Sequence, residues 1–306
     1  MKKYCEIENS YRNKHIAYFA DKNDIYNKKY VVLEKLHGAC FRVHISPDGS
    51  ISFGTRNRVL ESNAKFYDWK NAVSKLNLDV ITKRAKRNNA EITLYGELFG
   101  KGVNKGVEYQ DEKLIKFFDI RYNGLYMPWV DVNYLLTVCR LPVVPVVKDE
   151  VSLDDALNFN VESFKSLINK DAPDDNIAEG VVIKPMYEEV YIGHDRFILK
   201  KKTDKFKESM SKKKKKVKAA DPMVSKWKHS VSEYVTENRL HSLFSKKGEI
   251  DNPKQIGEYI KEYMEDVRND FNKDYPELAN DNLTKKQDKD IFNHSKDVVM
   301  MLNKYL

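Results

Sequence analysis

The pattern of the sequence changes near residue 220. Before residue 203, short runs rich in Val, Ile, Phe and Tyr are bounded by Gly, Pro, Asn or Asp, as β-strands are. Beyond residue 220, three segments place apolar residues at helical spacing, with breakers such as Gly248 and Asn252-Pro253 between them. The sequence therefore predicts two domains, residues 1–219 and residues 220–306. The strand-like runs are YVVLEKLHGACFRVHIS, SISFGTR, EITLYGELFG, IKFFDIRY, EGVVIKP and RFILKKK.

The two domains are expected to differ in fold class. Strand-like runs mixed with helical stretches favour an α+β first domain with mostly antiparallel sheets and flanking helices. One such stretch, residues 66–87, spaces Trp69, Val73, Leu76 and Val80 at helical intervals and ends in basic residues, which predicts a helix. The second domain is expected to be small and all-α.

Positive charge is concentrated in the first domain. The chain has 54 Lys and Arg against 46 Asp and Glu, a formal net charge of +8. Residues 221–306 contain 14 of the basic and 16 of the acidic residues, so residues 1–220 carry 40 against 30, a net of +10. A basic first domain suits a polyanionic partner such as nucleic acid or a nucleotide.

The cysteines and the apolar runs indicate a compartment. Cys5, Cys40 and Cys139 are odd in number and widely spaced, which argues for reducing conditions and against a disulfide framework. No apolar run approaches the roughly 20 residues that cross a membrane, and the N-terminus has no signal-type core. We therefore expect a cytoplasmic protein, or a nuclear one in a eukaryotic host.

A run of five lysines at residues 212–216 has three alternative interpretations. It is a solvated linker between the domains, a nuclear localisation signal, or a segment that contacts a nucleic-acid phosphate backbone without reading its sequence.

The stretch VVLEKLHGACF, residues 31–41, places Lys35 between Leu33 and Leu36 in an otherwise apolar strand. Desolvating an ammonium group is unfavourable by several kcal/mol unless something compensates it. A half-exposed strand with the lysine head in water is one explanation. The alternative is a reactive lysine, which needs surroundings that favour the neutral amine, since a free lysine has a pKa of about 10.4.

Other short stretches carry residues that suit the second explanation. Gly38 follows in EKLHG, and its missing side chain allows a ligand or another backbone to approach closely. A carboxylate to hold a cation, paired lysines for a phosphate, an aromatic ring for a base and a reactive lysine together make an inventory for nucleotidyl transfer. The remaining members, at strand ends or on one strand face, are Arg56, Glu97, Phe118, Glu179, Lys184, Lys200 and Lys202.

The order of these motifs resembles that of a known family. The chain shows KLHG, YGE, FFD, EGVVIK and KKK in the order found in covalent nucleotidyltransferases, which include DNA ligases and capping enzymes. Histidine after the lysine is similar to the ATP-dependent RNA ligases of the phage type-2 family, which are related to the trypanosome RNA-editing ligases. The segments KKYCEIENSY, GVNKGVEYQDEKLIKFFDI and ENRLHSLFSKKGEI extend the resemblance from near residue 2 to at least residue 250.

The resemblance implies a role for each matched residue. Lys35 would attack the α-phosphate of ATP, giving lysyl-AMP and pyrophosphate, and Glu179 would associate with Mg²⁺ or Mn²⁺. His37 would act after adenylation at the RNA ends, unless it is a structural histidine at a turn. The other matched positions are Glu34 and Phe118 at adenine, Arg56 and Glu97 near the ribose, and Lys200 and Lys202 at the AMP phosphate.

The implied reaction joins 5′-phosphate and 3′-hydroxyl ends of RNA, held in a nicked duplex or by a bridging strand, with no obligate protein partner. A DNA ligase or capping enzyme is an alternative, but His37 stands where those enzymes carry aspartate, and they have an all-β second domain. A non-catalytic RNA-binding protein of the same fold is the other alternative. Cys40 departs from the family, which usually has asparagine there, so that side chain's amide contact is in doubt.

Overall fold

The computed structural model describes residues 2–207, 222–250, 252–280 and 283–305. The chain divides into two compact units, Met1–Phe206 with Ser245–Lys247, and Lys207–Phe244 with Gly248–Leu306. The domain boundary expected at residues 219–220 and the lysine run at 212–216 both lie outside the described residues. Within the described residues, all strands belong to the first unit.

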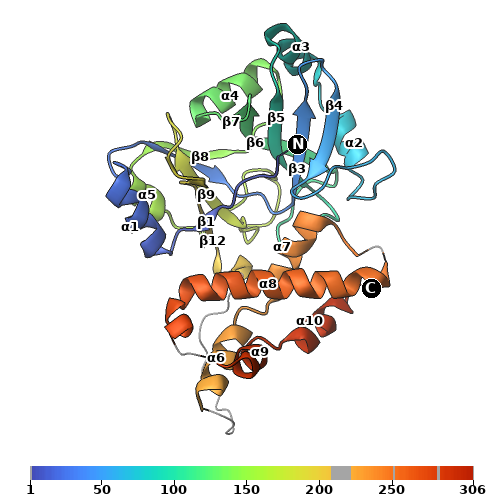
Figure 1. Ribbon diagram of the computed structural model, residues 1–306. Coiled ribbons are helices and arrows are strands. Elements are labelled where there is room, and N and C mark those ends of the chain that lie inside the picture. The colour runs from blue at the N-terminus through green and yellow to red at the C-terminus, as the bar shows by residue number, and fades with distance from the viewer. Residues whose placement is uncertain (1, 208–221, 251, 281–282, 306) are drawn as a thin grey trace. The chain divides into compact units, whose positions relative to one another are not determined.

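The first unit contains two five-stranded sheets and a short hairpin (Figure 1). Among the named strands, only β1 and β12 pair in parallel, and the other neighbours are antiparallel. The first sheet has the order β1 (Glu8–Asn9), β12 (Leu199–Lys202), β9 (Gly180–Pro185), β2 (Tyr30–Glu34) and β8 (Val146–Val151). The second has the order β4 (Ile51–Thr55), β3 (Ala39–Ile45), β5 (Ile92–Phe99), β6 (Leu114–Tyr122) and β7 (Leu125–Tyr126), and the hairpin is β10 (Tyr191–Ile192) with β11 (Asp195–Arg196).

Helices cover one face of each sheet. Residues of α1 (Asn13–Lys22) and α5 (Leu153–Leu157) pack on the first sheet, where Phe19 and Leu153 share a core with Val32 and Val181. Figure 1 shows these two helices side by side at the edge of the unit. The second sheet packs against α2 (Trp69–Ser74), α3 (Asp79–Asn88) and α4 (Trp129–Val138).

The remaining faces of the two sheets meet each other. Tyr95 of the second sheet and Ile198, next to β12, form a small buried cluster with Tyr4. Partly buried side chains from both sheets pack against it, among them Cys40, Phe118 and Val182. The residues predicted to bind the nucleotide therefore lie where the two sheets face each other.

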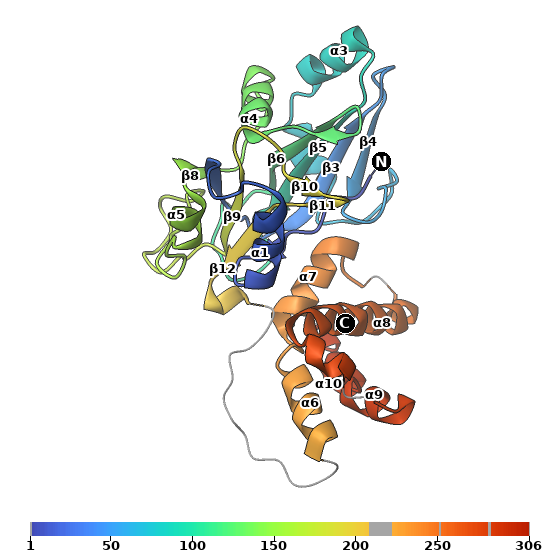
Figure 2. The ribbon, with the colours of Figure 1, turned by 60° about the vertical axis from the view of Figure 1, so that its left-hand side comes forward.

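The second unit is helical in its described residues (Figure 2). Its core forms around α8 (Ile256–Asp274), whose Tyr263, Val267 and Phe271 are fully buried. The other helices are α6 (Pro222–Ser232), α7 (Glu237–Lys247), α9 (Lys285–Ile291) and α10 (Ser295–Leu302), with 3₁₀ turns at Pro253–Gln255 and Pro276–Asn280. A further 3₁₀ turn, Asp204–Phe206, ends the first segment of the first unit. No helix in the described part of the chain is both long and apolar enough to span a bilayer.

The predicted α+β class with antiparallel sheets and a helical C-terminal region is confirmed, but the single helix expected at residues 66–87 is wrong. The segment forms two helices, because the Asn77 side chain accepts a hydrogen bond from the Asp79 N–H at 3.1 Å and so starts a new helix. Val80, expected on the apolar face, is 43% exposed. The long run at residues 30–46 also divides, into β2 and β3 of different sheets, with the break at residues 35–38.

Candidate active site

Lys35 and Lys202 approach each other across Gly180. The Lys35 N–H donates to the Gly180 carbonyl at 3.0 Å, and Lys202 is the register partner of Gly180 on β12. Gly180 has φ +149°, and a Cβ there would lie 2.0 Å from the Lys201 carbonyl oxygen. Only glycine fits this position, so two lysine side chains flank a residue that has none.

Glu179 is the common partner of the predicted catalytic groups. Its Oε2 lies 2.8 Å from Lys35 Nζ and 3.3 Å from His37 Nδ1, while its Oε1 lies 2.9 Å from Lys202 Nζ. The side chains of Glu179, Lys202 and Lys35 are 5%, 9% and 21% exposed. The unfavourable burial of Lys35 is thus offset by a carboxylate that is itself held by a second lysine.

The two carboxyl groups of the site differ in ionisation. Burial opposes the charge of Glu179, but Lys202 and Lys35 outweigh it and hold the pKa of Glu179 well below its usual range. Burial, with the charge of Glu179 added to it, raises the pKa of Glu97 to about 8. One carboxylate therefore carries its charge at neutral pH, while the other is poised to gain or lose a proton there.

The turn between β2 and β3 fits tightly against β5. The Gly38 N–H donates to Glu97 Oε1 at 3.2 Å, and a Cβ on Gly38 would lie 2.3 Å from the Leu98 carbonyl oxygen. This close approach, which the sequence predicted for Gly38, brings the Glu97 carboxyl beside the residues that follow Lys35. The ring of His37 rests near Phe206, with 4.8 Å between the ring centroids.

Phe118 reaches the space between the sheets because of an irregularity in β6. The register of β5 and β6 shifts between Tyr95, opposite Asp119, and Gly96, opposite Phe117, so Phe118 is the extra residue of a β-bulge. Phe117 is fully buried in the main core, whereas Phe118 is partly buried and packs edge-on against Tyr4, with 5.1 Å between ring centroids. Phe117 thus supplies a ring to the core, and Phe118 supplies a ring to the site.

Behind Phe118 lies a buried ionic cluster. Asp119 accepts a hydrogen bond from Lys184 Nζ at 3.0 Å with Oδ1, and from Arg196 at 2.5 Å and the Tyr4 hydroxyl at 2.8 Å with Oδ2. Although burial opposes ionisation, Arg196 and Lys184 lower the pKa of Asp119. Lys184 is 1% exposed, so its side chain is held inside this cluster and is not open to a ligand.

Three further predicted residues lie around this centre. Both carboxylate oxygens of Glu34 accept hydrogen bonds, from the Ser166 hydroxyl at 2.6 Å and the Leu167 N–H at 2.9 Å. Arg56, directly after β4, donates to the Cys5 carbonyl at 3.4 Å. Lys200 lies two residues before Lys202 on the same face of β12, opposite Val182. The geometry thus joins Lys35, His37 and Lys202 directly to Glu179, and Glu97 meets the same turn through the Gly38 N–H.

Two models of known protein families match this chain. Residues 28–202 match the family described as RNA ligase, and residues 218–301 match the one described as T4 RNA ligase 2 C-terminal. The chain belongs to the RNA ligase family. The first match covers more than half of the sequence and contains every predicted site residue.

The fold is shared with a solved RNA ligase structure. A Naegleria gruberi RNA ligase mutant with ATP and Mn is 18% identical with a TM-score of 0.51, and the match covers 67% of this chain and 57% of that one. The same organism's RNA ligase with PPi is 19% identical with a TM-score of 0.49, and that match covers 67% of this chain and 57% of the other. The chain therefore spans little more than half the length of these relatives.

Carboxylates are the donors that this member of the family offers to a divalent cation. The described residues contain no cluster of three or more His, Cys, Asp or Glu side chains that could enclose a metal. Glu179 and Glu97 lie close enough for the charge of one to raise the pKa of the other. Magnesium is commonly held by one or two carboxylates, with water and substrate phosphates completing its shell, and these residues fit that arrangement.

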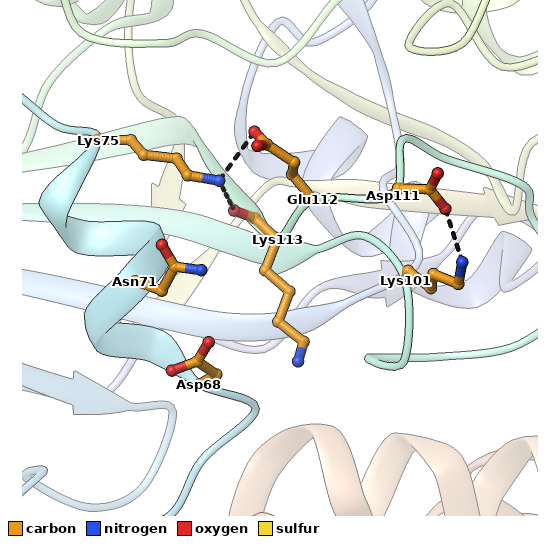
Figure 3. Close-up of a pocket in the computed structure, with 7 residues that line it drawn as sticks. All are labelled: Asp68, Asn71, Lys75, Lys101, Asp111, Glu112 and Lys113. Carbon is orange, nitrogen blue, oxygen red and sulfur yellow. Dashed lines mark hydrogen bonds and ion pairs between the residues drawn. The ribbon is translucent and has the colours of Figure 1, made fainter.

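A separate pocket of about 390 Å³ lies between α2 and the loop that follows β5 (Figure 3). Two ion pairs lie in its lining: Lys75 with Glu112 at 2.9 Å and Lys101 with Asp111 at 2.8 Å. None of the residues predicted from the ligase motifs lines it. One wall of this pocket is the outer side of the loop at residues 100–113. The inner side of the same loop reaches the active site.

The sequence motifs missed several contacts at the site. The Tyr109 hydroxyl accepts the His37 N–H at 2.7 Å, and Asn104 Nδ2 donates to the Gly38 carbonyl at 2.8 Å. Tyr4 touches both Phe118 and Asp119. These residues are separated from their partners by more than 60 positions, and a local pattern carries no signal for such contacts.

Proposed function

We propose that the protein is an ATP-dependent RNA ligase that joins a 5′-phosphate to a 3′-hydroxyl through a lysyl-AMP intermediate. One observation carries the proposal: in a member of the RNA ligase family, Lys35, His37 and Lys202 all converge on the buried carboxylate of Glu179. A structural lysine would need one counter-ion and no more. A carboxylate that gathers a nucleophilic lysine and a second lysine places both where one phosphate can meet them.

In the first step, the neutral amine of Lys35 attacks the α-phosphorus of ATP. A P–N bond forms as the bond to the bridging oxygen breaks, pyrophosphate leaves, and the amine loses a proton. Lys202 lies 2.9 Å from Glu179 and offers its charge to the phosphate oxygens, on which negative charge develops in the transition state. Lys200, on the same strand face, adds a second cation for the AMP phosphate.

In the later steps, a 5′-phosphate oxygen of the RNA attacks the AMP phosphorus and releases Lys35, and the 3′-hydroxyl then attacks the activated 5′-phosphate and releases AMP. His37 is assigned to these steps from the family resemblance, and its ring lies 3.3 Å from Glu179. Phe118 is assigned to stacking on adenine, Glu34 to its amino edge, and Arg56 and Glu97 to the ribose.

The cofactors follow from the carboxylates and from the relatives. Naegleria gruberi RNA ligase mutants have been solved with ATP and Mn and with AMP and Mn. We assign ATP and Mg²⁺ or Mn²⁺ to this chain, with Glu179 as the metal-associated residue. A bound divalent cation would neutralise phosphate charge and polarise the α-phosphate.

RNA is the proposed substrate, in a nicked duplex or bridged by a complementary strand, with no obligate protein partner. The helical unit, residues 220–306 in our assignment, is proposed to engage the RNA, and its net charge of −2 means that local basic faces make the contact.

The test of the first step is transfer of labelled AMP from ATP to the protein. Lys35→Ala should abolish the adduct and keep the fold, since it removes a nucleophile and relieves a burial penalty. Lys35→Arg should also fail, because a guanidinium does not deprotonate in proteins. An adduct that persists in Lys35→Ala, or transfer of GMP from GTP as efficient as that of AMP, would contradict the assignment.

The test of the substrate is sealing of nicked duplexes in which each side of the nick is RNA or DNA. We expect sealing when the 3′-hydroxyl side is RNA, because its terminal 2′-hydroxyls distinguish it from DNA. Equal sealing of an all-DNA nick would favour a DNA ligase instead.

A further inference from the structure

The turn that joins β2 to β3, residues 35–38, has unusual backbone support. The chain leaves β2 at Glu34 and enters β3 at Ala39, so residues 35–38 lie between two sheets without a strand partner on both sides. The N–H of His37 donates to the Tyr109 hydroxyl, and that of Gly38 donates to Glu97. Side chains from elsewhere in the chain, and not a strand ladder, thus hold this turn in place.

On the upstream side, the support comes from Ser166. Its hydroxyl donates to Glu34 Oε1 at 2.6 Å, and the next residue, Leu167, donates its N–H to Oε2 at 2.9 Å. Glu34 is 2% exposed, so a carboxylate with no such donors would be strongly disfavoured there. Because each carboxylate oxygen has two lone pairs, Glu34 keeps acceptor capacity for a ligand while its rotamer is fixed.

On the downstream side, the support comes from Tyr109. Its hydroxyl is 2.7 Å from the His37 nitrogen, and its ring packs edge-on against Phe99, with 5.1 Å between centroids. The outer side of the same loop is tied to α2, where Lys75 pairs with Glu112 at 2.9 Å (Figure 3). A rigidly held ring therefore fixes the position of a main-chain atom of His37.

One residue connects the two supports, through its side chain on one side and its main chain on the other. Asn176 accepts the Glu108 N–H at 2.7 Å and donates to the Glu108 carbonyl at 2.9 Å, so it clamps the residue before Tyr109. The Asn176 carbonyl oxygen accepts the Ser166 N–H at 3.1 Å. Asn176 is 8% exposed and lies three residues before Glu179.

We propose that Ser166, Asn176 and Tyr109 form a brace that positions the two functional neighbours of Lys35: Ser166 orients Glu34, Tyr109 orients His37, and Asn176 joins the two. These are positioning residues, since none of them touches the reacting atoms. The inference deepens the proposed function and rests on it, because it assigns Glu34 and His37 to different steps of that reaction.

The brace predicts which step each variant slows. Tyr109→Phe should slow the same step as His37→Ala by about three- to tenfold, the usual effect of one neutral hydrogen bond. Ser166→Ala should slow the same step as Glu34→Gln by about ten- to 100-fold, because its hydrogen bond goes to a carboxylate. Asn176→Ala should slow the His37-dependent step, because its side chain holds Glu108 next to Tyr109, whereas the main-chain carbonyl that meets Ser166 remains. Matched controls are Tyr122→Phe, whose hydroxyl meets Asn88 on an exposed surface, and Asn160→Ala, which contacts Ser163 in an exposed turn.

The experiment measures single-turnover rates of AMP transfer from ATP to the enzyme, from adenylated enzyme to RNA, and of sealing of adenylated RNA. A brace gives step-specific losses in the brace variants and leaves the two controls at the wild-type rates. Equal losses in all steps from Ser166→Ala and Tyr109→Phe, or rates like the controls, would overturn it.

Amide hydrogen exchange provides a readout that does not depend on activity. Tyr109→Phe and Asn176→Ala should speed exchange of a peptide covering residues 35–40 relative to Tyr122→Phe, because the His37 N–H loses its acceptor or that acceptor loses its position. Unchanged exchange would refute the brace. If the wild-type protein takes no AMP from ATP but this exchange changes, the proposed function fails while the structural brace stands.

Discussion

Replacing Glu97 by glutamine should change how stability depends on pH. The pKa of this carboxyl is raised from 4.5 to about 8, mainly by burial and then by the charge of Glu179. Between these two values the unfolded chain has released the proton and the folded protein still binds it. Folding is therefore coupled to proton uptake, and the wild-type free energy of unfolding should fall as pH rises through this window.

The size of the effect follows from the shift. A full difference of one proton changes the free energy of unfolding by 1.36 kcal/mol per pH unit, or about 2.7 kcal/mol from pH 5.5 to 7.5. Because the Glu97 side chain is only partly buried, water weakens the effect, and we expect the free energy of unfolding to change by about 1–2 kcal/mol. Glu97→Gln does not titrate, so its stability relative to the wild type should rise by that amount across the interval.

Urea unfolding at pH 5.5, 6.5 and 7.5, followed by tryptophan fluorescence, measures this difference. Both proteins share the same helical unit and the same other titrating groups, so their contributions cancel. Glu61→Gln, at an exposed position of the same unit, is the control and should run parallel to the wild type. The reasoning would be refuted if the free energies of unfolding of Glu97→Gln and the wild type changed in parallel with pH. It would also be refuted if Glu97→Gln gained stability relative to the wild type toward low pH.

Three further outcomes are expected. Lys202→Ala should slow AMP transfer at least about 100-fold in a labelled-ATP assay, whereas Lys201→Ala, whose ammonium meets the Leu157 carbonyl on the opposite face, should transfer at the wild-type rate. Gly180→Ala should destabilise the first unit by at least about 2 kcal/mol in urea unfolding, because of its positive φ and the contact with the Lys201 carbonyl; a wild-type midpoint would show that the strand can shift. A chain that ends after Lys207 should still form lysyl-AMP but seal nicked RNA poorly, and sealing at the full rate would remove the helical unit from RNA engagement.

The sequence predicted those parts of the site that are encoded locally. Lys35, Gly38, Glu97 and Glu179 could be named because a glycine beside a charged residue at a strand end is visible in a few letters. The meeting of Lys35, His37 and Lys202 on one carboxylate has no local signal, since the pairing of β2 with β9 joins segments more than 140 positions apart.

Other features were beyond local pattern. The doublet Phe117-Phe118 reads as two alternating strand residues, and only the register shift opposite Gly96 shows that the second ring turns toward the site. The break of the helix at residues 75–78 depended on one asparagine side chain competing with the backbone. Tyr109 and Asn176 lie in loops with no periodicity, where their contacts follow from tertiary packing alone.

The pairing of β1 with β12 has a consequence for synthesis in the cell. Asn9 and its partner Lys200 are 191 positions apart, and Tyr4 needs Asp119 and Arg196 to complete its contacts. At about 5–20 residues per second, the N-terminal strand waits on the order of 10–40 s after its own emergence before its partner has been translated. The nucleotide site is thus among the last parts of the first unit to close, and a nascent chain stalled before residue 200 cannot take up AMP.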